Sequence, residues 1–87
     1  MTDQDTAVFM RALGKRVRLL RLTAELTQEE LGDAAGISRS FVSLIEHGAR
    51  GVDVVRLLRI AAVLGLPLHE LVNRGPRGAD RVEGLPS

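Results

Sequence analysis

The sequence predicts an all-α fold, a compact bundle of five short helices. Apolar residues recur at the three- and four-residue spacing that is typical of amphipathic helices. Three of these stretches follow a residue that favours a helix N-terminus and end at a glycine. The chain has 87 residues, of which 45% are hydrophobic and only two are aromatic. It therefore allows one domain with a small core, packed by Leu, Val, Ile and Ala.

The first helix is expected from about residue 7 to residue 23, after a flexible N-terminus of residues 1–6. Its apolar stripe has nearly 3.6-residue spacing and consists of Phe9, Leu13, Val17 and Leu20. The charged residues between positions 11 and 24 are all basic, although the net charge of the chain is only +1. This segregation predicts a basic face suited to phosphate contact, and the alternative is the solvated side of an ordinary surface helix.

The second helix is expected to begin after Thr27, an N-cap candidate that forms a capping box with Glu30. Gly36 supplies the left-handed conformation that ends this helix. Gly32 lies in its interior, where glycine costs about 1 kcal/mol relative to alanine. Its presence there predicts that another helix approaches closely at this point.

The third helix is expected to begin after Ser38, the next N-cap candidate, and to end at Gly48. Val42 and Ile45 form its buried i, i+3 pair. Two helices joined by a short turn that contains glycine make a helix-turn-helix. We therefore expect this motif over residues 27–48.

The fourth helix is expected over residues 54–64, with Asp53 as N-cap and Gly65 at its end. A short fifth helix follows over residues 68–72, introduced by Pro67. The inward residues of the fourth helix are expected to be Leu57, Ile60, Ala61 and Leu64. The domain then spans residues 7–72, and residues 73–87, rich in Gly, Pro and charge, are expected to form a disordered tail.

Four stretches occur together in an order and spacing that resemble a known family: RLLR at 18–21, LTQEELGDAAG at 26–36, ISRSFVSLIEHG at 37–48 and LLRIAAVLGLPLHELV at 57–72. This is the Xre/Cro family of phage-repressor-like helix-turn-helix regulators. The resemblance implies a lambda-repressor-like bundle that binds double-stranded DNA and acts as a transcriptional regulator, a repressor, without a cofactor. One departure is Glu25, which stands where the family usually has glycine, so we expect a strained turn between the first two helices.

In a helix-turn-helix the second helix contacts base edges with its N-terminal residues, while the first crosses the phosphate backbone. Arg39 is a candidate for a bidentate contact to guanine, worth about 1–3 kcal/mol of discrimination, with a phosphate contact as the alternative. Leu44 can contact only a thymine methyl group, and otherwise it is an ordinary exposed leucine. The resemblance and this geometry together predict a DNA-binding set of Gln28, Ser38, Arg39, Ser40, Ser43, Leu44 and Arg50.

Gln28 lies at a helix N-terminus, where backbone N–H groups and the helix dipole attract phosphate. The resemblance implies that its side chain contacts the DNA backbone or orients Arg39, and the alternative is a solvent-exposed helix former. Phe41 stands where the family commonly has threonine, and it either packs over the preceding helix or meets a deoxyribose. The resemblance also pairs Arg21 with Glu46 in a structural salt bridge that fixes the recognition helix.

The composition argues against several other classes of protein. Cysteine is absent, which excludes disulfides and thiolate metal sites, and the two histidines, His47 and His69, fall in different helices. No nucleophile–base set, metal-ligand spacing or phosphate-binding glycine loop is present, so we expect no enzyme activity. No apolar run approaches the roughly 18 residues of a membrane span, and a cytoplasmic location is expected.

The alternative function is a protein-binding module, such as an antitoxin subunit that binds a partner protein and autoregulates its operon. Apolar residues near the two ends of the domain offer surface for a partner or a second copy: Val8, Phe9, Met10, Leu66, Leu68, Leu71 and Val72. Core packing is the other interpretation, favoured for Leu68 and Leu71. A homodimer would match a palindromic operator with half-sites about 34 Å apart.

Overall fold

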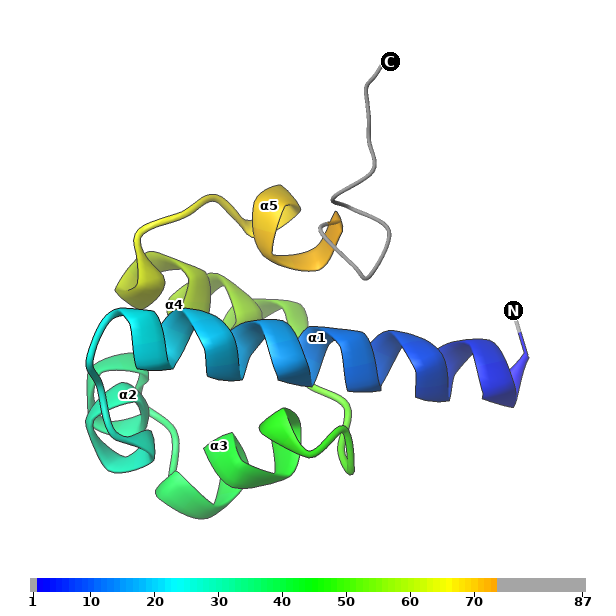
Figure 1. Cartoon of the computed structure of the whole chain (residues 1–87), viewed down its shortest axis with the longest axis horizontal. Coiled ribbons are helices and arrows are strands. Elements are labelled where there is room, and N and C mark those ends of the chain that lie inside the picture. The colour runs from blue at the N-terminus through cyan, green and yellow to red at the C-terminus, as the bar shows by residue number, and fades with distance from the viewer. Residues whose placement is uncertain (1, 74–87) are drawn as a thin grey trace.

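The computed structural model describes residues 2–73, which form five α-helices and no strand (Figure 1). The helices are α1 (Asp3–Thr23), α2 (Gln28–Ala35), α3 (Arg39–Glu46), α4 (Val54–Leu64) and α5 (Leu68–Asn73). The prediction of an all-α five-helix fold is confirmed. The expected tail lies outside the described residues, apart from Asn73, which is the last residue of α5. Within residues 2–73, no helix is both long enough and apolar enough to cross a membrane.

The predicted capping residues begin and end the helices of the motif. Thr27 Oγ1 accepts from the backbone N–H of Glu30 at 3.0 Å, and Glu30 Oε1 accepts from that of Thr27 at 2.9 Å. Asp53 caps α4 in the same manner, accepting from the N–H of Arg56 at 2.8 Å. Gly36 ends α2 with a φ of 76°, in the left-handed region that favours glycine. These boundaries follow from local hydrogen bonding alone.

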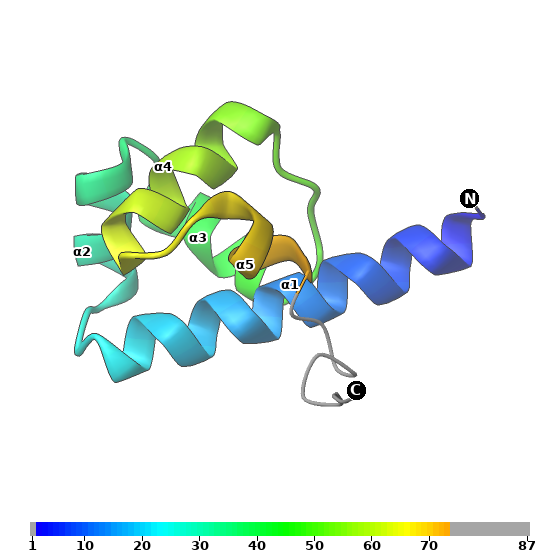
Figure 2. The same cartoon turned by 90° about the horizontal axis from the view of Figure 1, so that it is seen from above.

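The start of α1 differs from the sequence prediction. The helix begins at Asp3 rather than near residue 7, because Thr2 and Asp5 form a capping box. Residues 3–6 are therefore its first turn rather than part of an N-terminal tail. Phe9 was expected on the apolar stripe of this helix and also among the apolar residues that offer surface for a partner, and it is 44% exposed. The N-terminal half of α1 extends beyond the other helices in both views (Figures 1 and 2).

All five helices contribute buried residues to the core, with α1 packed against α3 and α5, and α2 packed against α3 and α4. The α2 and α3 helices lie on one side of α1, and α5 lies on the opposite side beside α4 (Figure 1). Burying one Leu, Ile or Val side chain contributes about 1.5–3 kcal/mol, so a core of this size can hold one small domain. Leu71 is buried, and Leu68 is half-buried and packs against the core, as the core-packing interpretation of these two residues predicted. The buried apolar residues are Leu13, Val17, Leu31, Ala35, Val42, Ile45, Leu57, Ile60, Ala61 and Leu71.

The turn between α1 and α2 carries the expected backbone strain. Glu25 has a φ of 61°, the only positive value among the non-glycine residues that the structure describes. A left-handed residue with a Cβ costs about 1–2 kcal/mol. The turn therefore stores strain that glycine at this position would relieve.

Candidate nucleic-acid interface

The recognition helix α3 lies at the edge of the molecule and has one buried and one exposed face (Figure 1). Val42 and Ile45 are buried against the core, with 1% and 2% exposure. Arg39, Ser40 and Leu44 are exposed on the rest of the helix. A helix held in this way presents its N-terminal turn and one full side to a ligand.

Close backbone contacts hold α3 against its neighbours at two glycines. A Cβ on Gly14 would lie 2.7 Å from the carbonyl oxygen of Glu46, and still closer to that of Ile45. Sequence reasoning missed Gly14, although a glycine inside a long helix was a usable signal. A Cβ on Gly32 would lie 2.6 Å from the carbonyl oxygen of Ile37. The close approach expected at Gly32 is therefore real, but it is made by the turn that leads into α3 rather than by a packed helix.

A buried ion pair joins α1 to the end of α3. Arg21 Nε lies 2.6 Å from Glu46 Oε2, and Arg21 Nη2 lies 3.0 Å from Glu46 Oε1. The two side chains are only 8% and 1% exposed. The hydrogen bonds to Glu46 raise the pKa of Arg21 despite burial, and Arg21 Nη1 also donates to the carbonyl oxygen of Leu26 at 2.8 Å. The pairing implied by the family resemblance is thus present, in bidentate geometry.

Gln28 belongs to the same network. Its Nε2 donates to Glu46 Oε1 at 3.2 Å, and the side chain is half-buried. The alternative of a solvent-exposed helix former is therefore wrong. The network joins the end of α1, the start of α2 and the end of α3. It orients the side-chain amide of Gln28 so that the amide nitrogen faces Glu46. Sequence reasoning missed this contact because 18 positions separate the two residues.

The other predicted site residues lie on or beside α3. Ser38 Oγ accepts from the backbone N–H of Phe41 at 3.0 Å, which leaves its hydroxyl hydrogen available. Ser43 is half-buried, and its Oγ lies 3.5 Å from His47 Nδ1. Arg39 is exposed on the first turn of α3.

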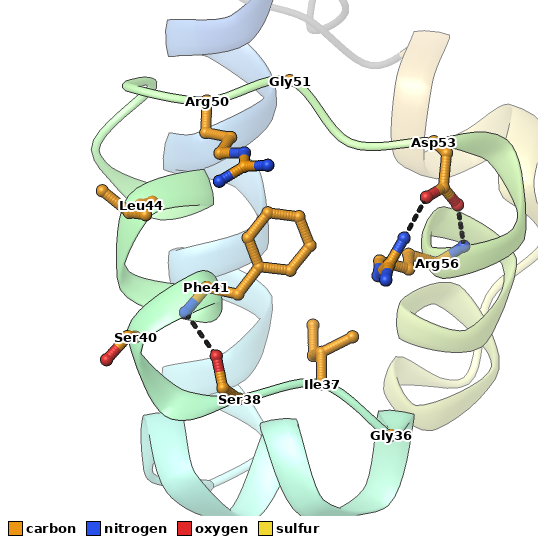
Figure 3. Close-up of a pocket in the computed structure, with 10 residues that line it drawn as sticks. All are labelled: Gly36, Ile37, Ser38, Ser40, Phe41, Leu44, Arg50, Gly51, Asp53 and Arg56. Carbon is orange, nitrogen blue, oxygen red and sulfur yellow. Dashed lines mark hydrogen bonds and ion pairs between the residues drawn. The ribbon is translucent and has the colours of Figure 1, made fainter.

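The structure brings Ser38, Ser40, Leu44 and Arg50 together around one hollow, between α3 and the start of α4 (Figure 3). This hollow, the α3–α4 hollow, measures about 570 Å³ and is also lined by Phe41 and by the start of α4. Arg39 and Ser43 are not among its lining residues.

Two charged residues that line the α3–α4 hollow, Asp53 and Arg56, were not predicted as part of a site. Arg56 lies across from α3 and forms an ion pair with Asp53 (Figure 3). The backbone N–H of Arg56, followed by its guanidinium group, lowers the pKa of the Asp53 carboxyl. A cap at position 53 was expected, but the sequence did not show that the side chain at position 56 turns toward α3.

Residues 12–73 match the model of a family described as a helix-turn-helix domain. The chain belongs to this family. Its helix-turn-helix domain is 37% identical over 60 residues to the HTH-type transcriptional regulator y4dJ of Sinorhizobium fredii. The matched region covers 69% of this chain and 78% of the relative. The chain spans 46% of the length of two longer relatives with the same kind of name.

Two solved structures resemble this helix-turn-helix protein closely. The restriction-modification controller protein C.AhdI from Aeromonas hydrophila has 37% identity and a TM-score of 0.70, over 71% of this chain and 94% of that one. The biofilm regulator SinR, solved in complex with DNA, has 28% identity and a TM-score of 0.65, over 68% and 95%. The resemblance to Xre/Cro regulators is confirmed, and the function of the domain is DNA-binding transcription regulation.

Proposed function

We propose that this protein binds a palindromic operator as a homodimer, inserts α3 into the major groove and represses transcription. One observation carries the proposal: α3 exposes its first turn while a buried ion pair and two glycine contacts hold its other side. Base readout requires that the side chains in contact with the bases are held in position. A rigid helix of this kind meets that requirement. The site of action would be the cytoplasm, where the DNA of a bacterial regulator lies.

Each predicted site residue has a role in this proposal. Arg39 contacts guanine, while Ser40 and Leu44 face the groove, the latter against a thymine methyl group. The remaining residues contact the phosphate backbone and position the helix: Gln28, Ser38, Ser43 and Arg50. The domain acts by binding DNA and not by catalysis.

The test is selection of bound sequences from random double-stranded DNA. A palindromic consensus supports both sequence specificity and a two-fold dimer, and its absence contradicts the proposal. The variant Arg39→Ala is expected to lose selectivity at one base position, with a cost of about 1–3 kcal/mol. Uniform weakening at all positions would instead assign Arg39 to phosphate.

The matched control is Arg16→Ala, which removes the same charge on another face. Arg16 is one of the basic residues between positions 11 and 24, but its Nε donates to the carbonyl oxygen of Glu70 in α5, on the side of α1 opposite to α3, so it lies outside the proposed interface. Base preference in this variant is expected to equal that of the parent protein. The same change of base preference in Arg39→Ala and Arg16→Ala would indicate a general effect of charge.

A protein partner is the second candidate, favoured by the exposed start of α1. Val8 and Phe9 are 46% and 44% exposed there, and a related structure of 26% identity and TM-score 0.70 is a complex of SinR protein with SinI protein. An antitoxin subunit that binds its partner and autoregulates would use both surfaces. Binding through this apolar surface is expected to persist at high salt, whereas DNA binding weakens steeply. Retained partner binding in Val8→Ser/Phe9→Ser would contradict this second candidate.

A further inference from the structure

Two guanidinium groups converge on one aromatic ring in the α3–α4 hollow. The Cζ atoms of Arg50 and Arg56 lie 5.2 Å and 5.4 Å from the centroid of the Phe41 ring. The three residues come from different elements, the ring from α3 and the arginines from the following loop and from α4 (Figure 3). The ring therefore links the recognition helix to two positive charges beside it.

The ring helps to order the exposed side chains of Arg50 and Arg56, the second of which also pairs with Asp53. A guanidinium group within about 6 Å of an aromatic centroid is attracted by the ring quadrupole. A long side chain that is held in place before a ligand arrives loses less rotamer freedom on binding. Phe41 is half-buried and packs against the core, so the aromatic ring itself is fixed in position.

The charges in the hollow favour an anion. Two guanidinium groups line it against one carboxylate, that of Asp53. The Asp53 carboxylate is already engaged by the backbone N–H and the guanidinium group of Arg56. Guanidinium groups suit phosphate, because their N–H donors match its oxygens in bidentate geometry.

The position of the hollow identifies which phosphate fits. Ser40 and Leu44 line it, and they are the residues proposed to face the major groove. A group that occupies the hollow while α3 lies in the groove must therefore lie beside the bases that α3 contacts. In double-stranded DNA that group is the sugar–phosphate backbone that borders the groove.

We propose that the α3–α4 hollow is a binding site for one DNA backbone phosphodiester, contacted by Arg50 and Arg56, with Phe41 as the positioning residue. The inference rests on the proposed function and adds Arg56, Phe41 and Asp53 to the interface. In the absence of DNA, Asp53 pairs with Arg56. On binding, the phosphate replaces the carboxylate as the partner of Arg56, and Asp53 remains the N-cap of α4.

The test measures DNA affinity between 50 and 200 mM salt for the full chain and its selected operator. Each lost phosphate contact lowers the log–log salt slope by about 0.9 per subunit. For the two subunits of a dimer, the ratio of wild-type to variant affinity therefore falls about twelvefold across this range. Arg50→Ala and Arg56→Ala are expected to show this change. Arg16→Ala is the matched control and is expected to keep the wild-type slope.

Two further variants separate this site from a general charge effect. Asp53→Asn retains an N-cap residue and removes the competing carboxylate, so its affinity for the operator is expected to rise. Phe41→Leu keeps an apolar side chain but removes the ring, and its affinity is expected to fall with a reduced slope, while Phe41→Tyr retains wild-type binding. Unfolding midpoints measured for each variant separate these effects from loss of fold.

The outcomes distinguish this inference from the function on which it rests. A wild-type protein that selects no operator would overturn both. An operator bound with equal salt slopes by Arg56→Ala and Arg16→Ala would overturn the phosphodiester site alone, and weaker binding by Asp53→Asn would do the same. Wild-type affinity and slope in Phe41→Leu would remove the positioning role of the ring.

Discussion

Two arginine–carboxylate pairs flank α3, and they differ mainly in burial. The Arg21–Glu46 pair is 8% and 1% exposed, whereas the Arg56–Asp53 pair is 47% and 49% exposed. A buried charge without its partner costs several kcal/mol, while an exposed ion pair contributes little because water replaces either partner. The first pair can therefore hold α3 in place, and the second can exchange its carboxylate for another anion.

The largest expected effect comes from breaking the buried pair. Glu46→Ala leaves Arg21 charged and buried and removes the acceptor of Gln28, so the free energy of unfolding is expected to fall by about 3–5 kcal/mol. DNA affinity is expected to fall with it. Thermal unfolding checks this prediction, and an unchanged midpoint would contradict it. In Arg21→Met/Glu46→Leu no charge is stranded, so a smaller loss is expected, although the carbonyl of Leu26 loses its donor.

A second large effect is expected where α1 and α3 backbones touch. Gly14→Ala places a Cβ 2.7 Å from the carbonyl oxygen of Glu46, and backbone cannot give way as a flexible side chain does. The helices must separate, with an expected loss of about 3 kcal/mol, at the upper end of overpacking costs. Gly51→Ala is the control, because its Cβ would meet only Met10 Sδ at 3.8 Å. Equal stability of the two variants in chemical denaturation would refute the close contact.

A smaller effect of opposite sign is expected at the turn before α2. Glu25→Gly relieves the left-handed strain at φ 61°, offset by the greater freedom of glycine in the unfolded chain, for a net gain of up to about 1 kcal/mol. Glu29→Gly makes the same replacement inside α2, where it is expected to cost about 1 kcal/mol. The denaturation midpoints of the two variants are expected to shift in opposite directions. That result would show that backbone conformation decides whether glycine stabilises or destabilises the fold.

The smallest expected effect concerns the exposed pair and pH. The pKa of Asp53 is lowered in the folded state, so its ionised form stabilises the fold above the unfolded value of about 3.9. That contribution is lost as pH falls through the lower folded value. The difference in unfolding midpoint between wild type and Asp53→Asn is therefore expected to be constant near neutral pH and to change below about pH 4. Arg21 has a raised pKa because of its hydrogen bonds to Glu46, so its guanidinium group stays protonated at all lower pH values, and its own deprotonation would remove the pair only at strongly alkaline pH.

The sequence predicted the boundaries of α2, α3 and α4 because those boundaries depend on near neighbours. Thr27, Ser38 and Asp53 each accept from a backbone N–H three residues later, so a short window of sequence contains both partners. The same rule explains the error at α1, where the capping box of Thr2 and Asp5 was overlooked. The buried Arg21–Glu46 pair was predicted through family resemblance, not through spacing.

The sequence by itself determined the five helices, the helix-turn-helix and the exposed face of α3, because hydrophobic periodicity and capping act over a few residues. Only the tertiary structure decided which long-range partners meet. It brought Gln28 onto Glu46 and placed Arg56 beside Phe41, pairs separated by 18 and 15 positions. It also left Phe9 exposed, because an apolar residue is buried only where another element covers it. Contacts of this kind depend on how the helices pack, and the local pattern does not encode them.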